Sequence, residues 1–134
     1  MSSIINIFSN NSSELLITQK LFEKEGFDVF TFSSVNEENL NSVYKNNPDI
    51  IILDLHIENS DGIELCQHFK SEKTLSSYVV VVTEHREEYI QIEAFKAGAD
   101  DYIIKPINSR ILVKRIYALL KRKLSNPKKP KLET

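Results

Sequence analysis

The fold of this chain is decided by the stretch Asp49-Ile50-Ile51-Ile52-Leu53-Asp54, in which four apolar residues stand in succession. A second run of the same kind is Val79-Val80-Val81-Val82. Strands that are apolar at successive rather than alternate positions are buried on both faces. The two runs therefore predict central strands of a parallel sheet that is covered by helices on both sides.

Outward from these runs, strand and helix patterns alternate along the whole chain. Further strands are expected at 4–8, 28–32 and 102–104. Helices are expected between Asn11 and Gly26, from Ser34 to about Lys45, from Gly62 to Lys70, from Glu87 to Ala97, and from Asn108 to about Lys123. Five strand-helix alternations require right-handed parallel crossovers, so the predicted class is α/β with a five-stranded, doubly wound parallel sheet.

Two of the expected helix starts carry a capping pattern. Asn11 is followed three residues later by Glu14, and Ser34 is followed by Glu37. In a capping box the first side chain accepts a bond from the backbone N–H three residues on, and the glutamate reaches back to the cap. We therefore expect Asn11 and Ser34 to be the N-caps of these helices.

Size and composition indicate one folded domain. The chain has 134 residues, of which 41% are hydrophobic and 27% charged, a balance typical of globular proteins. Its single cysteine, Cys66, excludes an internal disulfide, and with three histidines it excludes a Cys/His zinc cluster. No apolar run approaches the roughly 20 residues that cross a bilayer. We expect a cytoplasmic protein with no membrane partner.

The charge is distributed unevenly along the chain. Residues 1–109 carry 8 Lys/Arg against 18 Asp/Glu, whereas residues 110–134 carry 9 against 1. A basic end of this kind contacts an acidic partner or nucleic acid, or is a solvated helix face followed by a linker. We expect the folded domain at 1–123 and a basic linker or tail at 124–134, which is rich in Pro and Lys.

Polar side chains are expected where the strands end. In a doubly wound sheet the ligand site lies beyond the carboxyl ends of the strands. Asp54 and Thr83 follow the two central runs, Lys105 follows the last strand, and Ser9-Asn10-Asn11 follows the first. An acid, a hydroxyl and an amine that converge at one edge suit a carboxylate that accepts a phosphoryl group, with Thr83 and Lys105 bonding the phosphoryl oxygens.

These motifs resemble the receiver domain of bacterial two-component response regulators over residues 4–123. The stretch Ile50-Ile51-Ile52-Leu53-Asp54-Leu55 looks like the phospho-acceptor strand, and Asp61-Gly62 ends the following loop at the usual distance. The stretch Val79-Val80-Val81-Val82-Thr83 is similar to the strand that carries the switch hydroxyl. The segment from Ala97 to Pro106 closely matches the end of the fourth helix and the fifth strand.

The resemblance implies a flavodoxin-like (β/α)5 fold with strand order 2-1-3-4-5. It also implies a signalling module in a phosphorelay rather than an enzyme. Asp54 would be the phospho-acceptor, and Thr83 and Lys105 would bind the phosphoryl group. Tyr102 would be the aromatic residue that rotates inward when Thr83 moves.

The sequence departs from the family at the metal site. Two adjacent acidic residues follow the first strand in the family, and here these positions are Ser9 and Asn10. Mg²⁺ prefers oxygen ligands that include carboxylates. The remaining donors would be Asp54, the Asn10 side chain and the backbone of His56, so we expect Mg²⁺ to bind weakly or not at all. Lys105 is then expected to bond Asp54 directly.

The family resemblance also implies partners. A sensor histidine kinase would supply the phosphoryl group, and DNA would be reached only through an effector domain that is not in this chain. A homodimer would form through the fourth helix, the fifth strand and the fifth helix. The residues that match the family's interchain ion pairs are Asp100, Asp101, Arg115 and Arg122.

Two other functions remain open from the sequence. The missing acids favour a phosphorylation-independent dimerisation and interaction module. A small flavin-binding protein of the same topology is a more distant alternative, because Ser9-Asn10-Asn11-Ser12-Ser13 before a helix could hold a phosphate. The lack of glycine in that loop and of tryptophan in the chain argues against a flavin protein.

Overall fold

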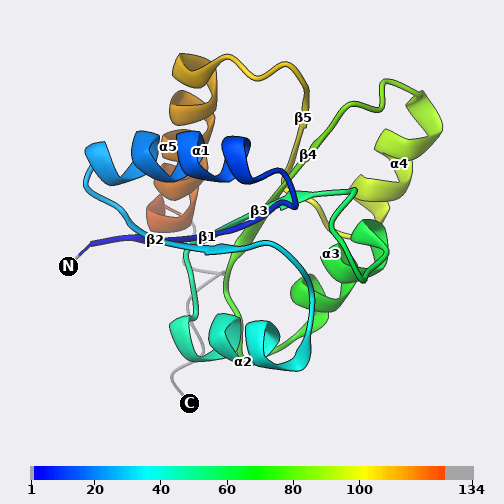
Figure 1. Cartoon of the computed structure of the whole chain (residues 1–134), viewed down its shortest axis with the longest axis horizontal. Helices are drawn as coiled ribbons and strands as arrows, with labels where there is room; N and C mark the ends of the chain where they lie inside the picture. The colour runs from blue at the N-terminus through cyan, green and yellow to red at the C-terminus, as the bar shows by residue number, and fades with distance from the viewer. Residues whose placement is uncertain (1, 126–134) are drawn as a thin grey trace.

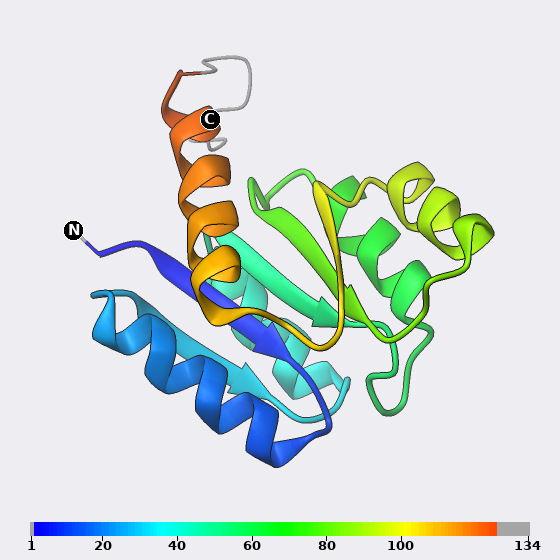
Figure 2. The same cartoon turned by 90° about the horizontal axis from the view of Figure 1, so that it is seen from above.

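The computed structural model, which describes residues 2–125, contains one parallel sheet of five strands. The strands lie in the order β2-β1-β3-β4-β5, and all of their arrows point the same way (Figure 2). Their bounds are β1 Ile4–Phe8, β2 Asp28–Phe32, β3 Ile50–Asp54, β4 Tyr78–Thr83 and β5 Asp101–Ile104. The predicted fold class and strand order are confirmed.

Five helices alternate with the strands and cover both faces of the sheet (Figure 1). Helices α1 and α5 lie on one face, and α2, α3 and α4 lie on the other. Their bounds are α1 Ser12–Lys24, α2 Glu37–Asn46, α3 Gly62–Ser71, α4 Glu88–Lys96 and α5 Ser109–Ser125. In the described part of the chain, none of the helices is long and apolar enough to span a membrane.

Two hydrophobic clusters, one on each face of the sheet, pack the helices against the strands. Strands β3 and β4 contribute to both clusters, because they are buried at every position. Alternate residues of each strand enter opposite clusters, as the pleat requires. Ile51 and Val79 contribute to the cluster beneath α2, α3 and α4, whereas Ile50 and Val80 contribute to the one beneath α1 and α5. Burying one such side chain contributes on the order of 1.5–3 kcal/mol. Each four-residue apolar run therefore contributes side chains to both clusters.

The helix ends differ from the predicted ones at two points. The N-cap of α2 is Asn36, whose side chain accepts from Asn39 N–H, so the prediction of Ser34 as the cap was wrong. The backbone carbonyl of Ser34 instead accepts from the Asn39 amide. Helix α5 continues to Ser125, two residues beyond the expected domain end at 123, and the rest of the predicted tail lies outside the described residues.

Gly62, at the first position of α3, packs against the loop that leaves the end of β3. A Cβ atom at this position would lie 2.6 Å from Leu55 Cα and 2.7 Å from the Leu55 carbonyl oxygen. Real Cβ atoms essentially never approach backbone this closely. Only glycine therefore allows the backbone after Asp54 to take this path, which explains the Asp61-Gly62 motif in physical terms.

Asn6 is a buried polar side chain that the apolar pattern does not explain. Asn6 lies in the middle of β1, is fully buried, and pairs in register with Phe30 and Ile51. Neither its amide nitrogen nor its amide oxygen has a hydrogen-bond partner among the described residues. A buried polar group left unpaired costs on the order of 1–3 kcal/mol. Asn6 therefore lowers the stability of the central sheet.

Replacing Asn6 by valine should stabilise the protein. Asn6→Val removes the unpaired amide and places a β-branched side chain in a central strand, so the free energy of unfolding should rise by about 1–2 kcal/mol in urea titrations. The matched control is Thr31→Val in β2, whose side chain reaches solvent and whose change should stay within about 0.5 kcal/mol. A loss of stability in Asn6→Val would contradict the interpretation of Asn6 as an unpaired polar group that destabilises the sheet.

Candidate phospho-acceptor site

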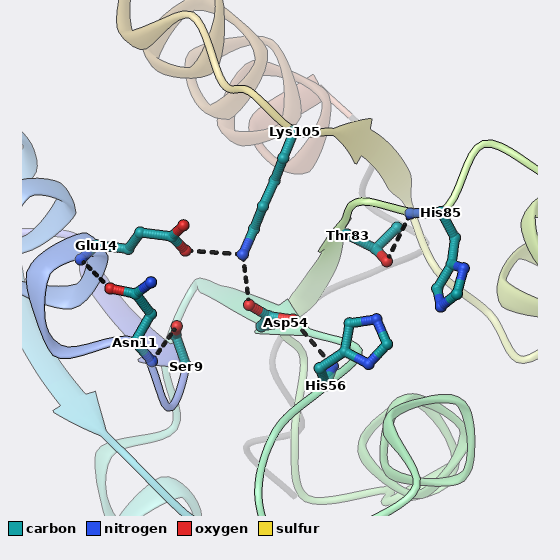
Figure 3. Close-up of polar contacts among 8 residues, drawn as sticks. All are labelled: Ser9, Asn11, Glu14, Asp54, His56, Thr83, His85 and Lys105. Carbon is teal, nitrogen blue, oxygen red and sulfur yellow. Dashed lines mark hydrogen bonds and ion pairs between the residues drawn. The ribbon is translucent and has the colours of Figure 1, made fainter.

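Asp54 ends β3 at the carboxyl edge of the sheet and is the centre of a polar cluster (Figure 3). Only 5% of the residue is exposed. Its Oδ1 accepts from the backbone N–H of His56 at 2.9 Å, and its Oδ2 accepts from Lys105 Nζ at 2.7 Å. The predicted direct bond between Lys105 and Asp54 is confirmed.

Lys105 reaches this carboxylate because β5 ends one residue before it. Its backbone N–H donates to the carbonyl of Thr83 at 2.8 Å, which ties the end of β5 to the end of β4. Its side chain is 14% exposed, so the ammonium lies largely out of water. Burial lowers the pKa of Lys105, but the bonds and charges of Asp54 and Glu14 raise it more, and the net pKa lies above its ordinary value. The ammonium is therefore charged at neutral pH.

Glu14 is the site residue that the sequence reasoning missed. Its Oε1 accepts from Lys105 Nζ at 2.7 Å, so the ammonium bridges two carboxylates. The capping-box pattern had assigned this side chain to the backbone of Asn11, but Asn11 N–H donates instead to Ser9 Oγ at 3.1 Å. The other half of the box is present, since Asn11 Oδ1 accepts from Glu14 N–H at 3.0 Å. No sequence signal singled out Glu14 as part of the site.

Thr83 and Tyr102, the expected switch residues, both bond to the backbone of His85, and their role as a switch remains a prediction. The Thr83 hydroxyl oxygen accepts from His85 N–H at 3.1 Å, and the Tyr102 hydroxyl donates to the His85 carbonyl at 3.1 Å. Tyr102 is 7% exposed, so its ring already lies inward. Burial, together with the charge of Glu87, raises the pKa of Tyr102 and keeps its hydroxyl protonated.

The positions after β1 do not rebuild an acidic metal site. Ser9 is buried and its hydroxyl is bonded to Asn11, whereas Asn10 is exposed. Among the described residues, no three His, Cys, Asp or Glu side chains are grouped so that they could hold a metal ion. Asp54 and Glu14 are both bonded to Lys105. As they lie, these side chains do not fit the carboxylate set that Mg²⁺ prefers.

Two imidazole rings lie close together beside the site. His56 and His85 lie at the start of the loops that follow β3 and β4, with their ring centroids 4.8 Å apart (Figure 3). His56 is exposed and participates in the site through its backbone N–H, as the bond to Asp54 shows. The expected metal contact of the His56 backbone remains a prediction.

A family comparison agrees with this geometry. The model for the response regulator receiver domain matches residues 6–117. The chain belongs to the response regulator receiver family. It is the receiver domain of a response regulator, a module of phosphorelay signalling, in which an aspartate generally accepts the phosphoryl group. Receiver domains generally bind Mg²⁺ at this site, and they are typically not enzymes.

Relatives and solved structures show how widely the receiver fold is shared. The chain is 32% identical over 122 residues to the alkaline phosphatase synthesis transcriptional regulatory protein PhoP of Bacillus subtilis, covering 91% of this chain and 50% of PhoP. It therefore spans about half the length of this curated relative. The response regulator DrrB of Thermotoga maritima, an OmpR/PhoB homologue, is 26% identical with a TM-score of 0.81, covering 92% of this chain and 54% of DrrB. A CheY-like receiver domain from Methanospirillum hungatei has a TM-score of 0.83 at 23% identity, covering 94% of this chain and all of that one.

The four residues expected at a dimer interface lie in different surroundings. Asp101 and Arg115 pair with each other within the chain at 3.2 Å and are partly exposed. Asp100 instead accepts from Lys70 Nζ at 2.7 Å and from Val79 N–H at 2.8 Å, so it stabilises the domain's own β4–β5 edge. Arg122 lies over the ring of Tyr78, 5.6 Å from its centroid. The contact of these four residues with a second chain remains a prediction.

The Lys105–Asp54 pair should be worth more than a surface ion pair. Lys105→Met leaves the buried Asp54 carboxylate without its counter-charge, so the free energy of unfolding should fall by about 2–4 kcal/mol in denaturant melts. Adding Asp54→Leu removes the stranded charge and should recover part of that loss. Lys96→Met, which breaks an exposed pair with Glu93, is the control and should change stability by less than about 0.5 kcal/mol. Equal losses in the single and the double variant would mean that the two residues are not coupled.

Proposed function

We propose that Asp54 of this receiver domain accepts a phosphoryl group from a sensor histidine kinase in the cytoplasm. The observation that carries the proposal is the contact of a buried strand-end carboxylate with both an ammonium and a backbone N–H. Both contacts are made to the carboxylate oxygens of Asp54, the kind of group that can act as the nucleophile in phosphoryl transfer.

In the proposed reaction, a carboxylate oxygen of Asp54 forms a bond to phosphorus. The bond from phosphorus to the donor's histidine nitrogen breaks, and the nitrogen keeps that electron pair. The product is an acyl phosphate on Asp54. Lys105 donates one N–H to a phosphoryl oxygen, and Thr83 can donate its hydroxyl proton because its oxygen is the atom that accepts from His85. Both donors stabilise charge on the transferred group.

The finer part of the proposal concerns the metal. We infer that this receiver domain binds Mg²⁺ weakly or not at all, because Ser9 and Asn10 replace the family's acidic pair and Lys105 already neutralises Asp54. Phosphoryl transfer relies on cations to offset the charge that gathers on the transferred group. One ammonium supplies only part of this compensation, so small phosphodonors should label the domain slowly.

Phosphodonor labelling tests the metal proposal. Intact-mass measurement after acetyl phosphate treatment should find most of the protein unmodified, with little difference between samples with and without Mg²⁺. The variant Ser9→Asp with Asn10→Asp rebuilds the acidic pair, and its labelling rate should become dependent on Mg²⁺ and rise by about tenfold or more. Asp54→Asn is the control and should remain unlabelled. Efficient, Mg²⁺-dependent labelling of the unaltered protein would overturn the metal proposal.

We further propose that the domain forms a homodimer through α4, β5 and α5. Supporting this, large apolar side chains are exposed on the two helices, at Tyr89, Ile92, Phe95 and Ile111. Asp101 and Arg115 lie partly exposed between them and could exchange their intrachain bond for one between chains. Regulation of transcription through DNA would then depend on an effector domain, as the name of the relative PhoP suggests.

An acid-to-arginine exchange tests the dimer. Asp101→Arg would place two cations together and should shift sedimentation velocity profiles toward monomer, with a dissociation constant raised by about tenfold or more. Asp28→Arg makes the same charge change at an exposed position of β2, at the opposite edge of the sheet, and should leave the profile unchanged. An unchanged dimer in Asp101→Arg would place the interface elsewhere, and a monomeric wild type would overturn the dimer proposal.

A further inference from the structure

We infer that Glu14 is a positioning residue of the phospho-acceptor site, which holds the ammonium of Lys105 where it can receive the phosphoryl group. The inference rests on the proposed role of Asp54 as the acceptor. It adds to the receiver site a carboxylate that comes from the first turn of α1 rather than from the positions directly after β1.

Two carboxylates, those of Glu14 and Asp54, hold the ammonium of Lys105 in place. Its Nζ lies 2.7 Å from Glu14 Oε1 and 2.7 Å from Asp54 Oδ2, so two of its three N–H groups are used (Figure 3). An ammonium on a flexible four-carbon stem is otherwise free to take many positions. When Asp54 becomes esterified, its bond to Lys105 must change, whereas the bond from Glu14 can stay in place. Glu14 therefore keeps the ammonium beside Asp54, with one N–H left for a phosphoryl oxygen.

The loop after β1 is organised to direct Glu14 toward Lys105. Ser9 Oγ accepts from Asn11 N–H, and Asn11 Oδ1 accepts from Glu14 N–H, which fixes the first turn of α1. In a complete capping box the glutamate would return to the backbone of its own cap. Here Ser9 occupies that backbone N–H, so the carboxylate of Glu14 is left to bond Lys105. The neutral residues at 9 and 11 thus have a structural role in the same arrangement.

Glu14 also changes the net charge of the site. Asp54 and Lys105 alone sum to zero, and Glu14 brings the three charged groups to a net charge of −1. That charge repels an incoming phosphoryl dianion, so Glu14 has two opposed effects on the reaction. It positions the ammonium through its hydrogen bond and disfavours the donor through its charge. The two effects can be separated, because glutamine keeps an oxygen acceptor at the same length and removes only the charge.

The decisive measurement is the initial rate of Asp54 labelling by acetyl phosphate, followed by intact mass. In that reaction the bond from phosphorus to the acetyl oxygen breaks and acetate leaves with the electron pair. Glu14→Ala should slow labelling by about five- to tenfold, because Lys105 loses its anchor. Glu14→Gln should label at the wild-type rate or faster. Glu23→Ala and Glu23→Gln, at an exposed position of the same helix, are the matched controls and should behave as wild type.

A second pair of variants separates positioning from a general effect on the fold. In a Lys105→Met background, Glu14→Ala should cause no further slowing beyond about twofold, because the group that Glu14 positions is gone. Equal slowing by Glu14→Ala in the wild-type and Lys105→Met backgrounds would overturn the inference. Faster labelling of both Glu14→Ala and Glu14→Gln than of the wild type would also overturn it, because charge repulsion alone would then explain the effect of Glu14.

The unphosphorylated protein provides an independent test. Urea midpoints of Glu14→Ala, Lys105→Met and the double variant should be non-additive, with the double variant less destabilised than the sum of the single ones. Labelling that survives in Asp54→Asn, or a complete lack of labelling of the wild type, would refute only the assignment of Asp54 as the acceptor. The comparison of urea midpoints among the single and double variants would then decide whether Glu14 holds Lys105. Additive midpoints would overturn the inference whatever the labelling shows.

Discussion

One ammonium group joins three elements of this receiver domain at the carboxyl edge of its sheet. Lys105, directly after β5, bonds Asp54 at the end of β3 and Glu14 in the first turn of α1. A buried charge costs free energy unless it is paired and hydrogen-bonded. Removing Lys105 would therefore leave Asp54 as an unpaired charge and lower the stability of the fold. The bridge therefore ties the first turn of α1 to the sheet edge and sets the charge around the Asp54 carboxylate.

The parallel sheet makes such a bridge possible. Because all five strands run in one direction, residues that are far apart in sequence reach the same edge, as Glu14 and Lys105 do across 91 positions. Thr83 lies at the same edge and accepts from the N–H of His85, whose carbonyl accepts from the hydroxyl of Tyr102. Asp54 is therefore two contacts away from α1, through Lys105, and two contacts away from the β4–α4 loop, through His56 and His85.

Much of the fold could be predicted from local patterns, and the errors have physical causes. The apolar runs of β3 and β4 required burial on both faces, and that requirement led to the correct sheet. The cap of α2 was misplaced from Asn36 to Ser34, because several polar residues near a helix start can accept the same backbone N–H. Asn6 was included in a strand without any sign that its amide would be left unpaired in the interior.

For the site, the sequence by itself determined which residues end the strands, and therefore that Asp54, Thr83 and Lys105 share one edge. It also determined that Ser9 and Asn10 bring no acidic charge to that edge. Only the tertiary structure decided the partners of the long charged side chains. Glu14 bonds Lys105 instead of the backbone of its expected helix cap, and Asp100 bonds Lys70. Such side chains have several rotatable bonds, and each bonds whichever opposite charge the packed helices and strands bring within reach, which spacing along the chain does not encode.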